Sequence, residues 1–214
     1  MKKILFAAVL IFCALITRAQ ENGKYIAAMN KNLMAMGDAF KNPASLLALA
    51  NNFERIAETE KTEWLPYYYA AFCQVNYGFM DTDKSKTDLI AEKATEFINK
   101  ADLLNPNNSE ISCIKSMIAS CHMMVNPMER YMQYGPESGR QLEAAMQQDP
   151  ANPRPELLIG QGLKYTPEQF GGGCKTAKVQ LEAARKKFET FKPASPMHPN
   201  WGKEMAQQIL DECK

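Results

Sequence analysis

The sequence predicts an all-α protein built from stacked helix pairs. The first observation is a spacing of small, large and small side chains, which appears at Ala94, Ile98 and Ala101. Steps of four and then three residues place all three side chains on one face of a helix. The second observation is that this spacing recurs at intervals of a few tens of residues, which is typical of helical repeat proteins.

Two further copies of the spacing follow along the chain. They are Ser138, Leu142, Ala145 and Ala177, Leu181, Ala184. Small side chains allow a neighbouring helix to approach closely, and the larger central side chain fills the space between the two helices. Pro106 follows the copy that begins at Ala94, and Pro150 follows the copy that begins at Ser138. Because proline cannot continue a helix, each of these prolines predicts a turn into the next helix pair.

The first nineteen residues have the pattern of a signal peptide. Lys2 and Lys3 form a basic start, residues 4–16 are apolar, and Ala19 is a small residue at the expected cleavage site. An apolar run of about 13 residues is short for a membrane span, which needs about 20. We therefore expect cleavage after residue 19 and export to the periplasm or beyond. A retained membrane anchor is the weaker alternative.

The remaining segment, residues 20–214, is expected to form one helical repeat domain. The 214-residue chain is 46% hydrophobic and 23% charged, which is a globular composition. Without the three basic residues of the signal peptide, 22 basic residues face 24 acidic ones. Nucleic acids and anionic membranes favour proteins with a basic excess, so neither is an expected partner.

The first helices are predicted from apolar periodicity and from capping residues. Residues 20–40 form one helix. Asn42 and Pro43 then provide a cap and a first-turn proline for the second helix. Thr62 is predicted to cap the third, which ends near Gly78.

A polar loop over residues 81–86 precedes the helix that contains Ala94. Asn108 or Ser109 is expected to cap the helix that follows Pro106.

The segment 126–139 is predicted to be a long connection. Pro127, Gly135 and Pro136 all disfavour a continuous helix there. A short helix with Leu142 then ends before Pro150.

In the C-terminal part, the next helix is predicted to begin at about Asn152. It contains Gly160 and ends near Tyr165. The glycines 171–173 are a flexible break before the helix of Ala177. The last helix, residues 201–213, is expected to cap the exposed end of the array.

Cys174 and Cys213 are predicted to form a disulfide. One begins the penultimate helix and the other ends the last helix, so the two lie at the same end if these helices are antiparallel. Export permits such a bond. Cys113 and Cys121 are about 12 Å apart on one helix, too far to pair, and are expected in the core.

No catalytic or metal-binding motif is present. Cys121 and His122 are neighbours on a helix and point about 100° apart, so they cannot form a dyad. The only other histidine, His198, is expected to cap the last helix. The sequence therefore predicts a non-enzymatic protein with no catalytic residue, no metal site and no cofactor.

From about Phe53 to Phe191 the chain resembles a tetratricopeptide-repeat protein, of the small exported type frequent in Bacteroidetes. Trp64 and the tyrosines after it resemble the start of a first helix, and Ala94 to Pro106 resembles a second. Gly160 stands where this family has a packing glycine. The resemblance implies a right-handed α-solenoid of about four helix hairpins plus the capping helix, with a concave groove.

The resemblance also implies which side chains line the groove. They are Tyr69, Phe72, Asn76, Met117, Ser120, Met124, Gln161, Lys164 and Tyr165. Aromatic, methionine and amide groups together suit a plastic binding surface. The alternative is that Tyr69, Phe72 and Met117 are core residues, because apolar stripes usually indicate packing.

The leading functional prediction is an exported, non-catalytic protein–protein interaction module that binds a segment of an envelope protein or peptide in this groove. A small-molecule or lipid carrier with a pocket between helices is the alternative. A self-associating structural role is a third. The residues themselves identify no ligand.

Overall fold

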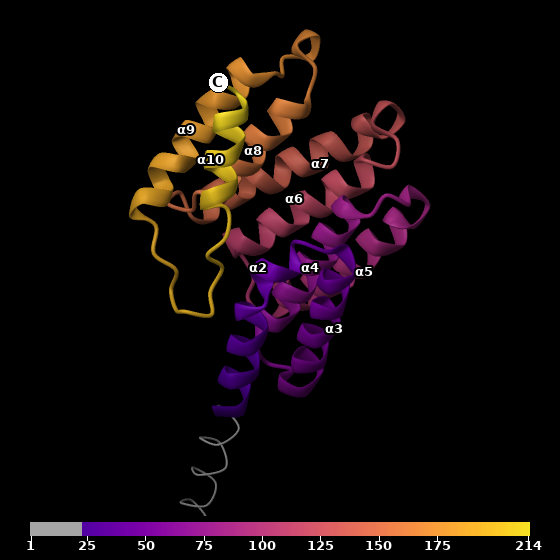
Figure 1. Ribbon diagram of the computed structural model, residues 1–214, viewed down its shortest axis with the longest axis vertical. Coiled ribbons are helices and arrows are strands. Elements are labelled where there is room, and N and C mark those ends of the chain that lie inside the picture. Colours follow the sequence, from indigo (N-terminus) through magenta and orange to yellow (C-terminus); the bar gives the residue numbers. More distant parts are fainter. Residues whose placement is uncertain (1–22) are drawn as a thin grey trace, which may run out of the picture.

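The structure, a computed structural model, describes residues 23–214 and is all-α over that range (Figure 1). This confirms the predicted fold class. The predicted signal peptide, residues 1–19, lies outside the described residues. None of the helices in the described range combines the length and the apolar character that a membrane span requires.

The helices pack chiefly on their neighbours in the chain, so that the array grows in sequence order (Figure 1). Their bounds are 23–34 for the first helical segment, α2 Met36–Ala39, α3 Pro43–Glu60, α4 Trp64–Met80, α5 Thr87–Leu104, α6 Ser109–Met123, α7 Pro127–Gln148, α8 Arg154–Tyr165, α9 Cys174–Thr190 and α10 Lys203–Glu212. Short 3-10 turns precede α5 and α9. The right-handed sense of the array stays a prediction.

The small residues that predicted close helix packing are buried. Ala94, Ala101, Ala177 and Ala184 have no exposed surface. Gly160 on α8 shows the same close approach: a β-carbon there would lie 2.6 Å from Cγ of Leu181 on α9. A larger side chain at that position would push the two helices apart.

The predicted caps Asn42 and Asn108 are confirmed, and the predicted cap Thr62 is wrong. The side chains of Asn42 and Asn108 accept hydrogen bonds from backbone amides at the starts of α3 and α6. Thr62 does not cap α4, because the helix begins one residue later, after Glu63. The Thr62 hydroxyl instead donates to the carbonyl of Glu60 at 3.0 Å.

The predicted long connection over residues 126–139 is also wrong, because α7 runs unbroken through it. Pro127 is the first residue of α7, where a helix tolerates proline. Pro136 lies inside α7, where a proline ordinarily costs about 3 kcal/mol. Packing on α6 offsets that cost: Ser138 is hydrogen-bonded to Ser116 at 2.8 Å, and Leu142 is buried.

The interior is divided into two hydrophobic clusters. The larger one extends from the helical segment 23–34 to α6, and the smaller one is formed by α8, α9 and α10. Between α9 and α10 the chain leaves the helices as a long irregular loop over residues 191–202, which we call the strap (Figure 1). Trp201 on the strap packs against both clusters.

Candidate functional site

A cleft of about 420 Å³ lies between the helical segment 23–34 and α3. This volume is within the usual range for small-molecule sites, about 300–1,000 Å³. We call it the N-terminal cleft. It is a valley between two helix faces, one for each wall. The lining residues are Lys24, Tyr25, Ala28, Lys31 and Asn32 on the first wall, and Asn52, Arg55, Ile56, Thr59 and Glu60 on α3.

The helical period explains how these side chains come to share a valley. On α3 the lining residues recur at steps of three, one, three and one, which is a single stripe of a helix. The neighbouring stripe of α3, which includes Phe53 and Ala57, is fully buried in the larger cluster. Met29 is also fully buried and anchors the segment 23–34 to the same cluster. The two walls are therefore fixed by core packing.

The rim of the N-terminal cleft is mainly cationic. Lys24, Lys31 and Arg55 are exposed, while the single acidic residue of the lining, Glu60, is partly buried. Arg55 is hydrogen-bonded to the side chain of Asn52. Because a guanidinium has five N–H donors, Arg55 keeps donors for a further acceptor.

The wall formed by the segment 23–34 contains a buried tyrosine. Tyr25 is 6% exposed, and its hydroxyl has no hydrogen-bond partner among the described residues. Burial raises the pKa of Tyr25 well above its usual value, and the carboxylates of Glu63 and Glu60 raise it further. The phenol is therefore a neutral donor throughout the physiological pH range.

A second, smaller cleft of about 220 Å³ lies between α9 and α10. Three basic residues line it, Lys178, Arg185 and Lys214, together with Glu182. Leu210 is the single apolar residue among those that line it. The charge of this second cleft is similar to that of the N-terminal cleft, but the second cleft offers little apolar surface.

Four of the nine predicted groove residues are buried and do not form an open surface. Tyr69, Phe72, Asn76 and Met117 are each less than 9% exposed. For these four, the prediction of an accessible groove is wrong, and the alternative of core packing is correct for Tyr69, Phe72 and Met117.

The strap is one reason why the α4 side chains are covered. The hydroxyl of Tyr69 donates to the backbone carbonyl of Met197 at 2.9 Å. The ring of Phe72 lies 5.0 Å from that of Trp201. The chain's own strap therefore occupies the α4 face on which the resemblance placed a partner.

The other five predicted groove residues lie in differing environments. Ser120 is hydrogen-bonded to Ser138 at 3.2 Å, and Lys164 forms an ion pair with Glu212. Gln161 is partly buried, whereas Met124 and Tyr165 are exposed. A binding role for these five stays a prediction.

A buried polar network centred on Arg154 was not predicted from the sequence. This residue is 0% exposed, and its guanidinium donates to Glu110 at 2.9 Å and to the carbonyl of Pro199 at 2.8 Å. The rings of Phe191 and Trp201 lie over the guanidinium, 4.8 and 5.0 Å from its central carbon. Arg154 therefore ties the strap to α6. No local signal distinguishes it from an exposed arginine.

Glu110 is the counterion in this network. Burial raises the pKa of Glu110 to about 7, and Arg154 beside it acts in the opposite direction. Asn152 and Tyr68 also donate to this carboxylate, at 2.9 and 3.4 Å. The junction between the two hydrophobic clusters therefore contains a group that titrates near neutral pH.

Both histidines take part in local structure. His122 is hydrogen-bonded through Nδ1 to Asp88 at 2.8 Å, and its ring stacks on Tyr134. His198 is on the strap, where Nδ1 is hydrogen-bonded to Ser195 at 2.7 Å and the ring lies against Trp64. His198 therefore does not cap α10, which begins five residues later.

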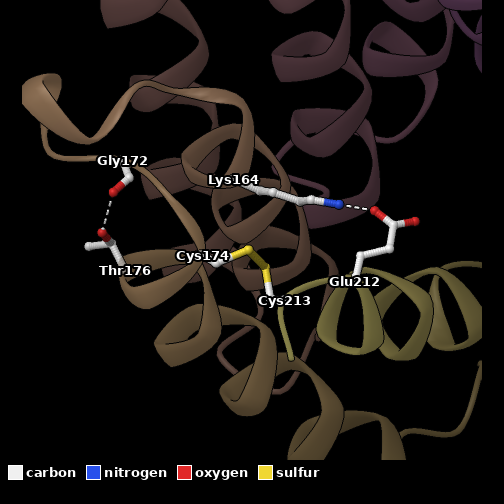
Figure 2. Close-up of a disulfide and its surroundings, with 6 residues drawn as sticks. All are labelled: Lys164, Gly172, Cys174, Thr176, Glu212 and Cys213. Atoms are coloured by element: carbon white, nitrogen blue, oxygen red, sulfur yellow. Dashed lines mark hydrogen bonds and ion pairs between the residues drawn. A yellow bond between two sulfur atoms is a disulfide. The ribbon is translucent and has the colours of Figure 1, made fainter.

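The predicted disulfide between Cys174 and Cys213 is confirmed (Figure 2). Its two cysteines are 39 residues apart in sequence, at the start of α9 and just after α10. Figure 2 also shows the ion pair of Lys164 with Glu212 beside the bond. Cys73, Cys113 and Cys121 are free and buried.

Among the comparisons with known proteins, the one with solved structures is informative. No family model matches the chain, and no curated protein matches it either. Among solved structures, the chain is similar to the HusA haemophore from Porphyromonas gingivalis, with 38% sequence identity and a TM-score of 0.79. The match covers 89% of this chain and 92% of that one.

This match corrects the leading functional prediction. It contradicts a protein–protein interaction module and favours the alternative, a small-molecule carrier. It confirms the coarser resemblance, to a small exported helical protein of the Bacteroidetes, but not the tetratricopeptide family itself. Together with the disulfide, it also confirms the predicted periplasmic or secreted location.

Proposed function

We infer, from the premise that this chain belongs to the family of the HusA haemophore, that it is an exported carrier of haem. The observation that supports this proposal most strongly is the 38% identity over 89% of the chain. A likeness that extends over 89% of the chain is not confined to one repeat.

The geometry of the N-terminal cleft supports the same proposal. Haem is a flat, largely apolar macrocycle that bears two carboxylate groups. The cleft combines a cationic rim with apolar lining from Ala28 and Ile56. Apolar walls with a few placed polar groups are typical of sites that bind such molecules.

The proposed role is binding and release without chemistry, so we assign no catalytic residue. As a carrier, the protein would pass its cargo to an acceptor in the cell envelope. We also propose that the helix pairs are tetratricopeptide-like, as the buried small residues on α5 and α9 suggest.

Titration of haemin into the purified protein tests the function. Trp64 and Trp201 are the two tryptophans of the chain, and haem bound nearby would quench their fluorescence. We expect saturable one-site binding with a dissociation constant of about 1 μM or tighter, which corresponds to roughly −8 kcal/mol. Serum-free buffer with lysozyme in place of this protein controls for non-specific quenching. A linear response without saturation would contradict the proposal.

A further inference from the structure

We propose that the N-terminal cleft is the cargo site and that Lys31 and Arg55 hold the cargo by its carboxylates. This inference rests on the proposed function and extends it from a ligand class to named residues. In this cleft, apolar lining and three cations meet around a volume of about 420 Å³.

The two cations come from opposite walls, Lys31 from the helical segment 23–34 and Arg55 from α3. Both side chains are exposed at the rim, so neither has to be moved out of a packed environment to reach a ligand. Charge-assisted hydrogen bonds to a carboxylate are about twice as strong as neutral ones, and an arginine can form two in parallel. A carboxylate between the walls would therefore be held from both sides.

The excess of positive charge in the lining favours an anionic ligand. The lining of the cleft contains three cations and one acidic residue, Glu60. None of these three cations, Lys24, Lys31 and Arg55, forms an ion pair within the described chain. Their charges are thus available to a ligand from outside.

The apolar side chains of the lining favour an anion that also has apolar surface. Ala28, Ile56 and the ring of Tyr25 offer surface that a small inorganic anion would leave uncovered. The cleft between α9 and α10 has a similar set of charges but about half the volume and Leu210 alone as apolar lining. The larger volume and apolar lining of the first cleft favour it over the second for a planar apolar molecule with carboxylates.

Tyr25 provides an independent sign of a ligand. It is more than nine-tenths buried, it lines the cleft, and its hydroxyl lacks a hydrogen-bond partner among the described residues. Burial of an unsatisfied donor is costly, and native proteins usually give such groups a partner. An acceptor on the cargo would supply that partner.

The test reverses the charges of the cleft and compares two ligands. The double variant Lys31→Glu with Arg55→Glu is titrated with haemin and with haemin dimethyl ester, which has no free carboxylate. The matched control, Lys178→Glu with Arg185→Glu, makes the same change of charge in the smaller cleft. All four positions are partly or fully exposed, so the variants are expected to fold, which circular dichroism would verify.

We expect the cleft variant to bind haemin at least roughly tenfold more weakly, because like charges placed together oppose binding. The control is expected to stay within about twofold of the unaltered protein. With the dimethyl ester, the cleft variant and the unaltered protein should bind equally, since the carboxylates that the cations recognise are gone. Tyr25→Phe should weaken binding of haemin by a smaller factor.

Equal haemin binding by the cleft variant and the unaltered protein would overturn the assignment of the site and leave the proposed function intact. A loss that persists in full with the dimethyl ester would overturn the carboxylate contacts. Absence of haemin binding by the unaltered protein would instead reject the proposed function, and with it this site.

Discussion

The two hydrophobic clusters of this protein are stabilised in different ways. The larger cluster, from the helical segment 23–34 to α6, buries Phe53, Tyr68 and Phe97 almost completely. The smaller cluster, in α8 to α10, has eight buried apolar residues, of which three are alanines. Because a small cluster buries little apolar surface, it gains less from the hydrophobic effect.

The disulfide joins the start of α9 to the end of α10, two of the helices that form the smaller cluster. A crosslink restricts the unfolded chain and so contributes stability that a small core cannot supply. The strap and Arg154 then connect this region to the larger cluster. One continuous array therefore combines a region stabilised mainly by burial with a region stabilised by a covalent bond.

The largest expected effect is at the connection between the two clusters. Arg154→Met would leave Glu110 buried without its cation, which typically costs about 3–5 kcal/mol. Urea unfolding would measure the loss, and two separated transitions would show that the clusters have become independent. Arg185→Met, at an exposed arginine, is the control and should change stability by less than about 0.5 kcal/mol.

The double variant Arg154→Met with Glu110→Leu sharpens this prediction. Replacing both partners of a buried ion pair is often neutral, so most of the stability should return. Failure of the second substitution to restore stability would show that the strap contacts, and not the ion pair, connect the clusters.

The next effect concerns the crosslink. Cys174→Ser with Cys213→Ser should lower the free energy of unfolding by about 4 kcal/mol in the chain-entropy model for a loop of this length. Hydrogen exchange should accelerate in α8 to α10 while α3 and α4 stay protected. Uniform acceleration along the whole chain would contradict the division into two regions.

A smaller effect is expected from close packing within the second region. Gly160→Ala places a methyl group 2.6 Å from Cγ of Leu181, and overpacking of this kind costs about 1–3 kcal/mol. A methyl group added at Gly162, on the same helix, would have no neighbour within 4 Å, so Gly162→Ala is the control. We expect it to stabilise by up to about 1 kcal/mol. Thermal unfolding of the two variants compares them directly.

A further expected effect is a pH dependence at the junction. The folded-state pKa of Glu110, about 7, lies above its ordinary value of 4.5. The native state therefore bears the cost of an ionised buried carboxylate above pH 7, and this cost disappears as the pH falls to about 4.5.

Unfolding free energies of the unaltered protein and of Glu110→Gln, measured from pH 8 to pH 5, test this sign. The unaltered protein should gain stability relative to the variant as the pH falls. A difference between the two proteins that is constant with pH would contradict the prediction.

Features that depend on near neighbours in the sequence were predicted well. Asn42 and Asn108 cap their helices because a cap needs only a side-chain oxygen two or three residues before the free amides. The burial of Ala94 and Ala177 followed from helical periodicity. Pro136 wrongly predicted a break in the helix because the packing of α7 on α6, which offsets the cost of this proline, is not visible locally.

The candidate site could not be predicted from helical periodicity. Lys31 and Arg55 lie on helices whose relative placement is set by the burial of Met29 and Phe53, and nothing near either cation in sequence marks it as special. Tyr69 and Phe72 were assigned to an open groove because the strap that covers them is more than 100 residues away in the chain.

Short-range geometry and the order of the helices were enough to predict that this protein is helical, where many of its helices begin and which two cysteines pair. They were not enough to predict which surfaces stay open to a ligand. That outcome depends on long-range packing: the strap covers α4, while the first helical segment and α3 leave a cationic cleft between them.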